Sequence, residues 1–268
     1  MSIPEKDLED LRYARSLLEN PGLAAKITNM FGAPIEKGFA LLPKNWSDIV
    51  ASSTQKALTV AMEAAIVTMN KRSGQTSSDF LHKILVAASG AGGGFFGFPA
   101  LPVELPISTT IMMRSIADIA RSEGEQISEP ETKMACIEVF ALGGPGKDDD
   151  AAETGYFVIR AGLARAVTEA AQYMAERGMA EKGAPVIVRL IAQVASRFGV
   201  QVSEKVAAPA VPVIGAAGGS ILNMLFVDHF QDMARGHFIV RRLEGKYGYD
   251  EVKKIYDGLY GAQRPHAT

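Results

Sequence analysis

The sequence has little cysteine and no large excess of charge of either sign. Its 268 residues contain one cysteine, Cys136, and a lone cysteine forms neither an internal disulfide nor a cysteine-based zinc site. The formal net charge is −2 at pH 7, so no general basic field attracts nucleic acid or anionic lipid. The polar and acidic residues 2–7 differ from a secretory signal peptide. We therefore expect a cytoplasmic protein that does not bind nucleic acid.

The motifs of several enzyme classes are also missing. The sequence has no Gly-x-Ser-x-Gly elbow, no Walker-A lysine motif and no His-Glu-x-x-His pair. His229 lies between Asp228 and Asp232 in the sequence, but on a helix it is rotated by about 100° from Asp228. This pattern favours an ion-paired helix face over a metal site. We expect no metal and no cofactor, and we favour a protein that is not an enzyme.

Helix-forming residues dominate the chain, and the alternation of apolar and polar residues that marks a half-buried strand is nearly absent. Glycine, proline and capping patterns delimit the expected helices. These run over about 2–20, 23–31, 47–70, 108–124, 128–144, 151–177, 185–199, 220–245 and 249–260. No long linker or low-complexity run separates two halves, so the sequence predicts a single all-α domain.

Two windows, 84–103 and 206–227, contain no charged residue. Each window directly follows a lysine and directly precedes an acid. These flanking residues are Lys83 and Glu104 for the first window, and Lys205 and Asp228 for the second. The parallel fits either an internal duplication or a coincidence of composition.

The windows have the length of a membrane-spanning helix, which needs about 20 apolar residues. Their composition is different, because they are rich in glycine and alanine and each is interrupted by two prolines. These prolines are Pro99 and Pro102 in the first window, and Pro209 and Pro212 in the second. An interrupted helix in lipid would leave backbone groups without hydrogen bonds. Three interpretations stay open: a buried pair of helices in close contact, a hydrophobic cleft for an apolar ligand, and reversible insertion into a bilayer surface.

Polar residues follow both windows and suggest the rims of a binding cleft. On a helix over 108–124, Met112 and Ile116 share an apolar side, while Arg114 and Asp118 share a polar one. A rim arginine suits a phosphate or carboxylate head group. The alternative interpretation is a solvated face on which Arg114 pairs with Asp118. The candidate ligand-binding residues are Gly92, Gly93 and Gly94 in the wall, Glu104, Thr109, Arg114 and Asp118 on one rim, and Asn223, Asp228 and Asp232 on the other.

The run PVELPISTTIMMRSIADIA at 102–120, followed by Gly124-Glu125, resembles the core signature of the EcsC family of bacterial proteins. The glycine-rich stretch before this run is similar to the family pattern as well. So are residues 136–144, where an acid lies in an apolar helix that ends in Gly-Gly, and the run HFIVRRLE at 237–244. The resemblance covers the chain from about Trp46 onward. It divides the single domain into an N-terminal helical extension, 1–45, and an EcsC-like core, 46–268.

The resemblance implies a helical protein that associates with the cytoplasmic side of a membrane. The family is named after a protein encoded beside a bacterial ABC transporter, and it supplies no defined catalytic residue. The acidic run at 148–150 departs from the family pattern.

Together these observations favour a non-enzymatic helical protein that binds a lipid or another apolar small molecule at or near the inner face of the membrane. Such a protein would be accessory to a transport or secretion system. Two alternatives stay open. One is a metal-dependent or acid–base hydrolase that uses the carboxylates of the two rims. The other is a scaffold that binds a membrane protein.

Overall fold

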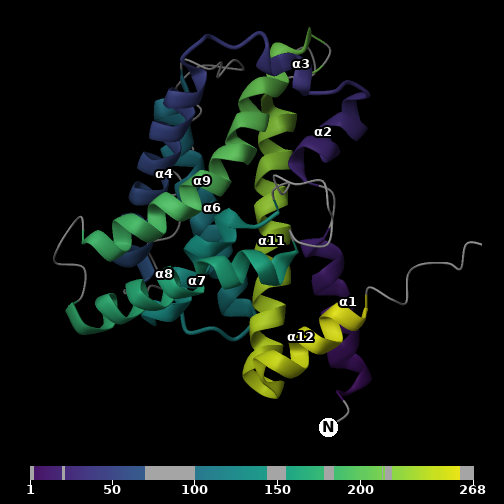
Figure 1. The fold of residues 1–268 in the computed structure, drawn as a ribbon, viewed down its shortest axis with the longest axis vertical. Helices are drawn as coiled ribbons and strands as arrows, with labels where there is room; N and C mark the ends of the chain where they lie inside the picture. Colours follow the sequence, from purple (N-terminus) through teal and green to yellow (C-terminus); the bar gives the residue numbers. More distant parts are fainter. Residues whose placement is uncertain are drawn as a thin grey trace, which may run out of the picture.

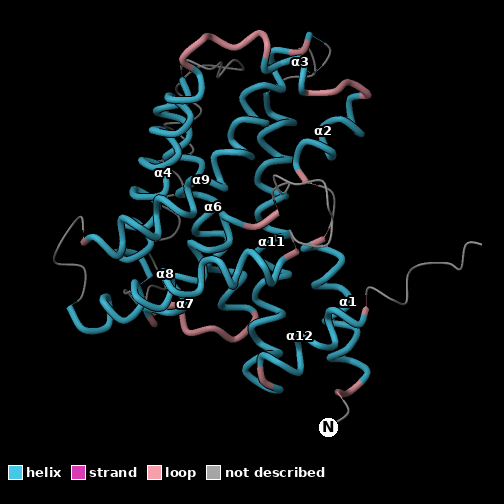
Figure 2. The backbone as a smooth tube through the Cα atoms, viewed as in Figure 1, coloured by secondary structure: helices cyan, strands magenta, loops and turns pink. Residues whose placement is uncertain are grey.

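The computed structural model describes residues 3–19, 22–69, 100–143, 155–177, 184–212, 214 and 219–259. Every regular element in this part of the chain is a helix, which confirms the predicted all-α fold (Figures 1 and 2).

The described residues form ten α-helices and two 3-10 turns, joined by loops. The α-helices are α1 (Glu5–Leu18), α2 (Leu23–Phe31), α3 (Glu36–Phe39), α4 (Trp46–Met69), α6 (Leu101–Ser122), α7 (Pro130–Glu138), α8 (Tyr156–Arg177), α9 (Pro185–Ala207), α11 (Gly219–Tyr247) and α12 (Tyr249–Gly258). The 3-10 turns are η2 (Val139–Ala141), after α7, and η3 (Ala208–Ala210), after α9.

Helix α6 begins seven residues earlier than the sequence predicts, at Leu101 instead of 108. Pro102 is its second residue, where the backbone N–H has no partner within a helix and a proline is well tolerated. The prediction that Pro102 interrupts the first window is therefore wrong. The last residues of this window, 101–103, form the first turn of α6.

Helix α9 does not end near Gly199 as predicted, but continues to Ala207. A glycine inside a helix costs about 1 kcal/mol relative to alanine. The neighbouring side chains of Phe198 and Val202 are fully buried, and their burial outweighs that cost. The helix gives way to η3, which contains Pro209, so this proline interrupts the second window as predicted.

The N-terminal segment differs from the prediction in two places. Helix α1 begins at Glu5, directly after Pro4, where the sequence predicts a start at about residue 2, and it has no side-chain hydrogen bond at its cap. The short helix α3 was not predicted. It packs against the end of α9, where a Cβ atom on Gly38 would lie 2.1 Å from the Ala207 carbonyl oxygen.

Helix α11 runs through the centre of the molecule (Figure 1). Its 29 residues span about 43 Å at 1.5 Å per residue. Helix α6 lies beside it and runs in the same direction, because Ser115 accepts a hydrogen bond from Gln231, and Glu125, just beyond α6, pairs with Arg241. Helix α4 packs on α6 and α9, and α1 packs on α11.

Buried phenylalanines join the central elements. The ring of Phe140 in η2 lies 5.0 Å from that of Phe198 in α9 and 5.4 Å from that of Phe230 in α11. All three side chains have no exposed surface. Such aromatic contacts add about 0.5–1.5 kcal/mol each beyond burial of their area, so this cluster fixes η2, α9 and α11 relative to one another.

Candidate functional site

The described ends of the two apolar windows meet at one end of the bundle. Nζ of Lys205 in α9 donates a hydrogen bond to Oε1 of Glu104 in α6, at 2.8 Å. The ammonium of Lys205 also lies 4.6 Å from the ring centroid of Phe226 in α11. Lys205 directly precedes the second window, and Glu104 directly follows the first. The charged flanks of the two windows therefore pair with each other.

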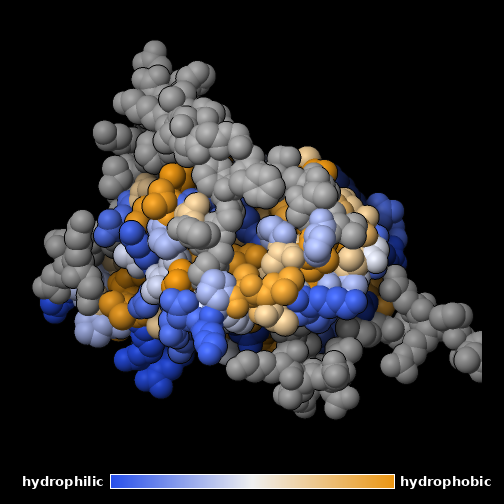
Figure 3. Space-filling model, turned by 90° about the horizontal axis from the view of Figure 1, so that it is seen from above, coloured by the Kyte–Doolittle hydropathy of each residue, from blue (hydrophilic) through white to orange (hydrophobic). Residues whose placement is uncertain are grey.

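We call this region the window end and define it by five residues: Val103, Glu104, Lys205, Met224 and Phe226. The window residues there contribute to both core and surface. Val103 is 68% exposed and Met224 is 59% exposed, whereas Phe226 is fully buried. Figure 3 looks at the molecule from above and shows hydrophobic residues on this face beside hydrophilic ones. The windows thus supply apolar surface as well as packing.

The three candidate glycines of the cleft wall, Gly92, Gly93 and Gly94, lie outside the described residues. Their part in the candidate site stays a prediction.

The four candidates of the first rim are spread along α6. Glu104 is at the window end, and Thr109 is fully buried, with a hydroxyl that has no hydrogen-bond partner among the described residues. Arg114 is half-buried. Asp118 is exposed and accepts a hydrogen bond from Arg121 at 2.7 Å. Glu104 and Asp118 are separated by about 21 Å along the helix axis at 1.5 Å per residue, so they do not meet one small ligand.

The three candidates of the second rim lie on α11. Asn223 and Asp228 are exposed. Asp232 is half-buried and accepts a hydrogen bond from Nζ of Lys26 in α2, at 3.1 Å. Among the described residues, no three histidine, cysteine, aspartate or glutamate side chains come together as a metal site. Because Asp232 binds Lys26, we interpret it as a residue that joins α11 to α2.

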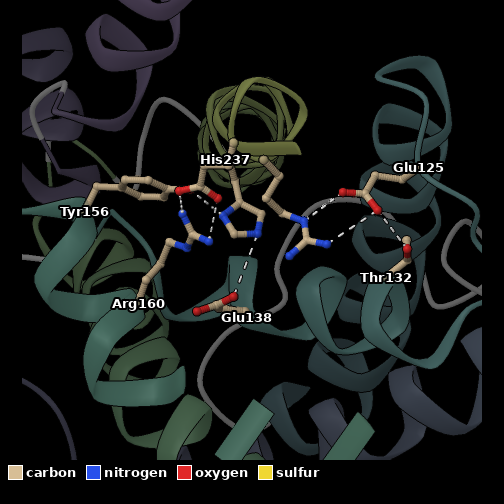
Figure 4. A network of polar contacts seen from close by, with 8 residues as sticks. Glu125, Thr132, Glu138, Tyr156, Arg160 and His237 are labelled. Atoms are coloured by element: carbon tan, nitrogen blue, oxygen red, sulfur yellow. Dashed lines mark hydrogen bonds and ion pairs between the residues drawn. The ribbon is translucent and has the colours of Figure 1, made fainter. Parts of the chain in front are cut away.

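A second group of polar residues, which the sequence analysis did not predict, lies in the interior (Figure 4). The hydroxyl of Tyr156 in α8 is 2.9 Å from Nδ1 of His237 in α11. On the other side of the ring, Nε2 of His237 is 3.8 Å from a carboxylate oxygen of Glu138 in α7. These three residues are no more than 4% exposed.

Burial determines the protonation of this group. Desolvation raises the pKa of Glu138 to about 7, against an attractive effect of Arg160 that lowers it. Desolvation also lowers the pKa of His237 well below its ordinary value. His237 is therefore neutral at pH 7. The Tyr156 hydroxyl and Nδ1 of the neutral ring share a hydrogen bond whose direction is set by the tautomer of His237.

Two ion pairs flank the buried residues. Both terminal nitrogens of Arg160 donate to the carboxylate of Glu244, at 2.6 and 3.0 Å. Arg241 donates to Glu125 at 2.8 Å, and the Thr132 hydroxyl donates to the same carboxylate at 2.8 Å. These contacts join side chains of α7, α8 and α11, so we interpret the network as a structural link between the three helices, although Nε2 of His237 has no hydrogen-bond partner among the described residues.

One part of this network left a signal in the sequence. Glu138 is the single charge in the apolar run 134–142, and a charge in a buried helix needs polar partners. Arg160 and Glu244 are 84 residues apart, and no local pattern connects them.

One described helical stretch, Pro185–Ala210, is long and apolar enough to cross a membrane by length and composition alone. Its most apolar part has a mean hydropathy of 1.2 and is 33% buried. It packs against α4 and α8. It overlaps the second apolar window over residues 206–210.

Comparison with known proteins gives one match, to the EcsC protein family over residues 5–243. The match includes most of residues 1–45, the stretch that the sequence analysis sets apart as an extension. No curated protein and no solved structure matches the chain.

Proposed function

Because the chain belongs to the EcsC protein family and its two apolar windows end against each other, we propose that it binds a lipid or another apolar ligand at the window end. In this proposal the protein is not an enzyme and acts at or near the cytoplasmic face of a membrane. The observation that carries the proposal is the ion pair between Glu104 and Lys205, which holds the ends of both windows together.

The chemistry of the window end suits a ligand with an apolar body and a polar head. Val103 and Met224 offer exposed apolar side chains, and burial of such a side chain contributes about 1.5–3 kcal/mol. Glu104, which directly follows Val103 in the chain, and Lys205 add one charge of each sign to the window end. With a net charge of −2, the protein has no general attraction to anionic lipid, so we expect binding that depends little on salt.

Sedimentation with phosphatidylcholine vesicles tests the proposal. The combined substitution Val103→Glu and Met224→Glu places two charges on the apolar surface. We expect the partition constant for the vesicles to fall at least tenfold, because each 1.4 kcal/mol is about a factor of ten in an equilibrium constant. The matched control is Val188→Glu, at a valine of α9 that is 43% exposed and not part of the window end. Equal vesicle binding by wild type and double variant would contradict the proposal.

Native mass spectrometry of protein purified without detergent separates the ways in which the window end could work. A stoichiometric lipid adduct supports a cleft that holds a ligand. Vesicle binding without an adduct supports insertion into the bilayer surface. If neither an adduct nor vesicle binding is found, contact with a membrane protein is supported. In that case the windows serve as a scaffold for that partner. The hydrolase alternative needs carboxylates of both rims, and Asp232 of the second rim is paired with Lys26, so no observation favours it.

A further inference from the structure

A pocket of about 490 Å³ lies between α8 and α12, next to the end of α1. This volume is in the range of small-molecule sites, about 300–1,000 Å³. The pocket is at the far end of α11 from the window end, since α12 directly follows the last residues of α11. It is therefore a second site, independent of the function proposed above.

Four aromatic side chains form much of the pocket wall: Tyr156, Phe157, Tyr249 and Tyr256. The ring of Phe157 meets that of Tyr249 at 83° and that of Tyr256 at 85°, with centroids 5.6 and 5.1 Å apart. Tyr249 is 43% exposed, so a ligand can reach it. The other three rings are at most 5% exposed, so Tyr249 supplies most of the accessible ring surface, and the negative face of an aromatic ring attracts cations.

Two cationic side chains of the protein lie close to these rings. The guanidinium of Arg160 is 5.2 Å from the Tyr156 centroid, 5.8 Å from that of Phe157 and 6.0 Å from that of Tyr249. Nζ of Lys253 is 5.6 Å from the Phe157 centroid. Both cations are neutralised by their own carboxylates, Arg160 by Glu244 and Lys253 by Asp257. Their positions show that the rings of this wall favour positive charge. Because each cation is paired with a carboxylate, neither adds a net positive charge to the pocket.

Glu19 gives the pocket a net negative charge. Its Oε1 accepts a hydrogen bond from the Tyr256 hydroxyl at 2.9 Å, which fixes the carboxylate beside the aromatic wall. Glu19 forms no ion pair within the described part of the chain. The other charged residues that line the pocket, Lys253 and Asp257, pair with each other. Arg15 lies 5.7 Å from the Tyr256 ring centroid but does not line the pocket.

We propose that this pocket binds a small organic cation, an amine or quaternary ammonium that carries an apolar or aromatic body. The body packs against Phe157 and Tyr249, and the positive group lies beside the carboxylate of Glu19. Hydrophobic burial and cation–aromatic attraction act together in this arrangement, and the single charge of Glu19 selects against anions.

Three probes of the same shape and different charge test the proposal on the full chain. They are 2-phenylethylammonium, 2-phenylethanol and 3-phenylpropionate, titrated at pH 7 and followed by calorimetry or ligand-observed NMR. We expect a Kd of about 1 mM for the cation, which is reasonable for a fragment of this size. We expect the alcohol to bind about fivefold more weakly and the anion more weakly still.

Two pairs of variants locate the binding site. Tyr249→Ala removes one wall and should lower the affinity for the cation about fivefold. Its control is Tyr13→Ala, which removes a tyrosine that is 48% exposed and outside the pocket. Glu19→Gln keeps an oxygen that can accept the Tyr256 hydroxyl. It should lower the affinity for the cation to that for the alcohol. Glu9→Gln, at an exposed acid of α1, is its control.

The proposal is overturned if the ammonium and the alcohol bind equally, if the anion binds most tightly, or if the ammonium shows no saturable binding. It is also overturned if Tyr249→Ala and Tyr13→Ala retain the same affinity for the cation. Thermal unfolding verifies that each variant is folded. If a variant is not, the three probes on the wild-type chain decide. Vesicle binding at the window end involves none of these residues, so failure here leaves that proposal standing.

Discussion

Lys205 and Glu104 form an ion pair at 2.8 Å although 101 residues separate them in the chain. Their side chains are 12% and 16% exposed, so both charges are largely removed from water. A charge in this position is costly without a partner. The pair therefore specifies how the end of α9 meets the start of α6, and with it the place where the two apolar windows come together.

The first prediction concerns this pair. Glu104→Gln leaves the ammonium of Lys205 without a counter-charge in a mostly buried position, and we expect the free energy of unfolding to fall by about 2 kcal/mol. Asp118→Asn is the control on the same helix, because Asp118 pairs with Arg121 at an exposed position. There we expect a change within about 0.5 kcal/mol. Urea unfolding at pH 7 measures both changes. Equal effects would show that the buried pair contributes no more to the free energy of unfolding than the exposed one.

The second prediction concerns Arg160, which binds both oxygens of Glu244. Arg160→Lys keeps the charge but loses the forked donor geometry and the contact with the Tyr156 ring. We expect the free energy of unfolding to fall by about 2 kcal/mol. Arg165→Lys is the control one turn and a half further along α8, where the arginine side chain is 87% exposed, and a change below about 0.5 kcal/mol is expected. If Arg160→Lys lowers the free energy of unfolding no more than Arg165→Lys does, a positive charge alone is what Glu244 requires.

The third prediction concerns the pH dependence of stability. Burial raises the pKa of Glu138 from an ordinary 4.5 to about 7. Between these values the folded protein keeps a proton that the unfolded chain has lost. The resulting stabilisation is present below pH 4.5 and disappears as the pH rises to 7, a change of about 3 kcal/mol at 1.36 kcal/mol per pKa unit.

Glu138→Gln removes this titration. The free energy of unfolding of the variant minus that of wild type should therefore rise with pH between about 4.5 and 7, and stay level above. Glu204, with a pKa raised to about 7, and His237, with a lowered pKa and the opposite pH trend, are present in both proteins. Urea unfolding over this pH range measures the difference, with the exposed Glu131→Gln on α7 as control. A difference that does not change with pH would place a charged Glu138 in the folded state.

The sequence predicted the helices well because the signals for helices are local. The bounds of α2 coincide with the predicted 23–31, but the predicted helix over 128–144 was wrong at its end, because α7 ends at Glu138 and continues only as the 3-10 turn η2 to Ala141. The end of α9 was predicted wrongly because Gly199 is a local stop signal that the burial of Val202 overrides.

The candidate site could be predicted less well because it depends on distances between helices. A helical wheel groups Glu104 and Asp118 by angle, but it contains no information on their separation along the axis. The partner of Asp232 is Lys26, which is 206 residues away. The contact of Tyr156 with His237 across 81 residues likewise follows from packing, for which the sequence holds no short-range signal.

The last prediction concerns the close approach of α1 to α11. A Cβ atom on Gly236 would lie 2.6 Å from Cγ of Leu18 and 2.9 Å from the carbonyl oxygen of Ala14. The carbonyl oxygen belongs to the backbone of α1 and cannot move away without shifting the helix. Cγ of Leu18 can move only by a change of rotamer of this buried side chain. We expect Gly236→Ala to lower the free energy of unfolding by about 2 kcal/mol, as overpacking of a core contact does.

Gly245 offers a matched substitution on the same helix with the opposite sign. It is exposed, and a Cβ atom there would have no contact within 4 Å. Alanine has the higher helix propensity, so Gly245→Ala should raise the free energy of unfolding by about 0.5–1 kcal/mol. Both changes are measurable as shifts of Tm, about 2–4 °C per kcal/mol for a chain of this size. Because propensity favours alanine at both positions, a stabilising Gly236→Ala would show that α1 does not lie against α11 at this distance.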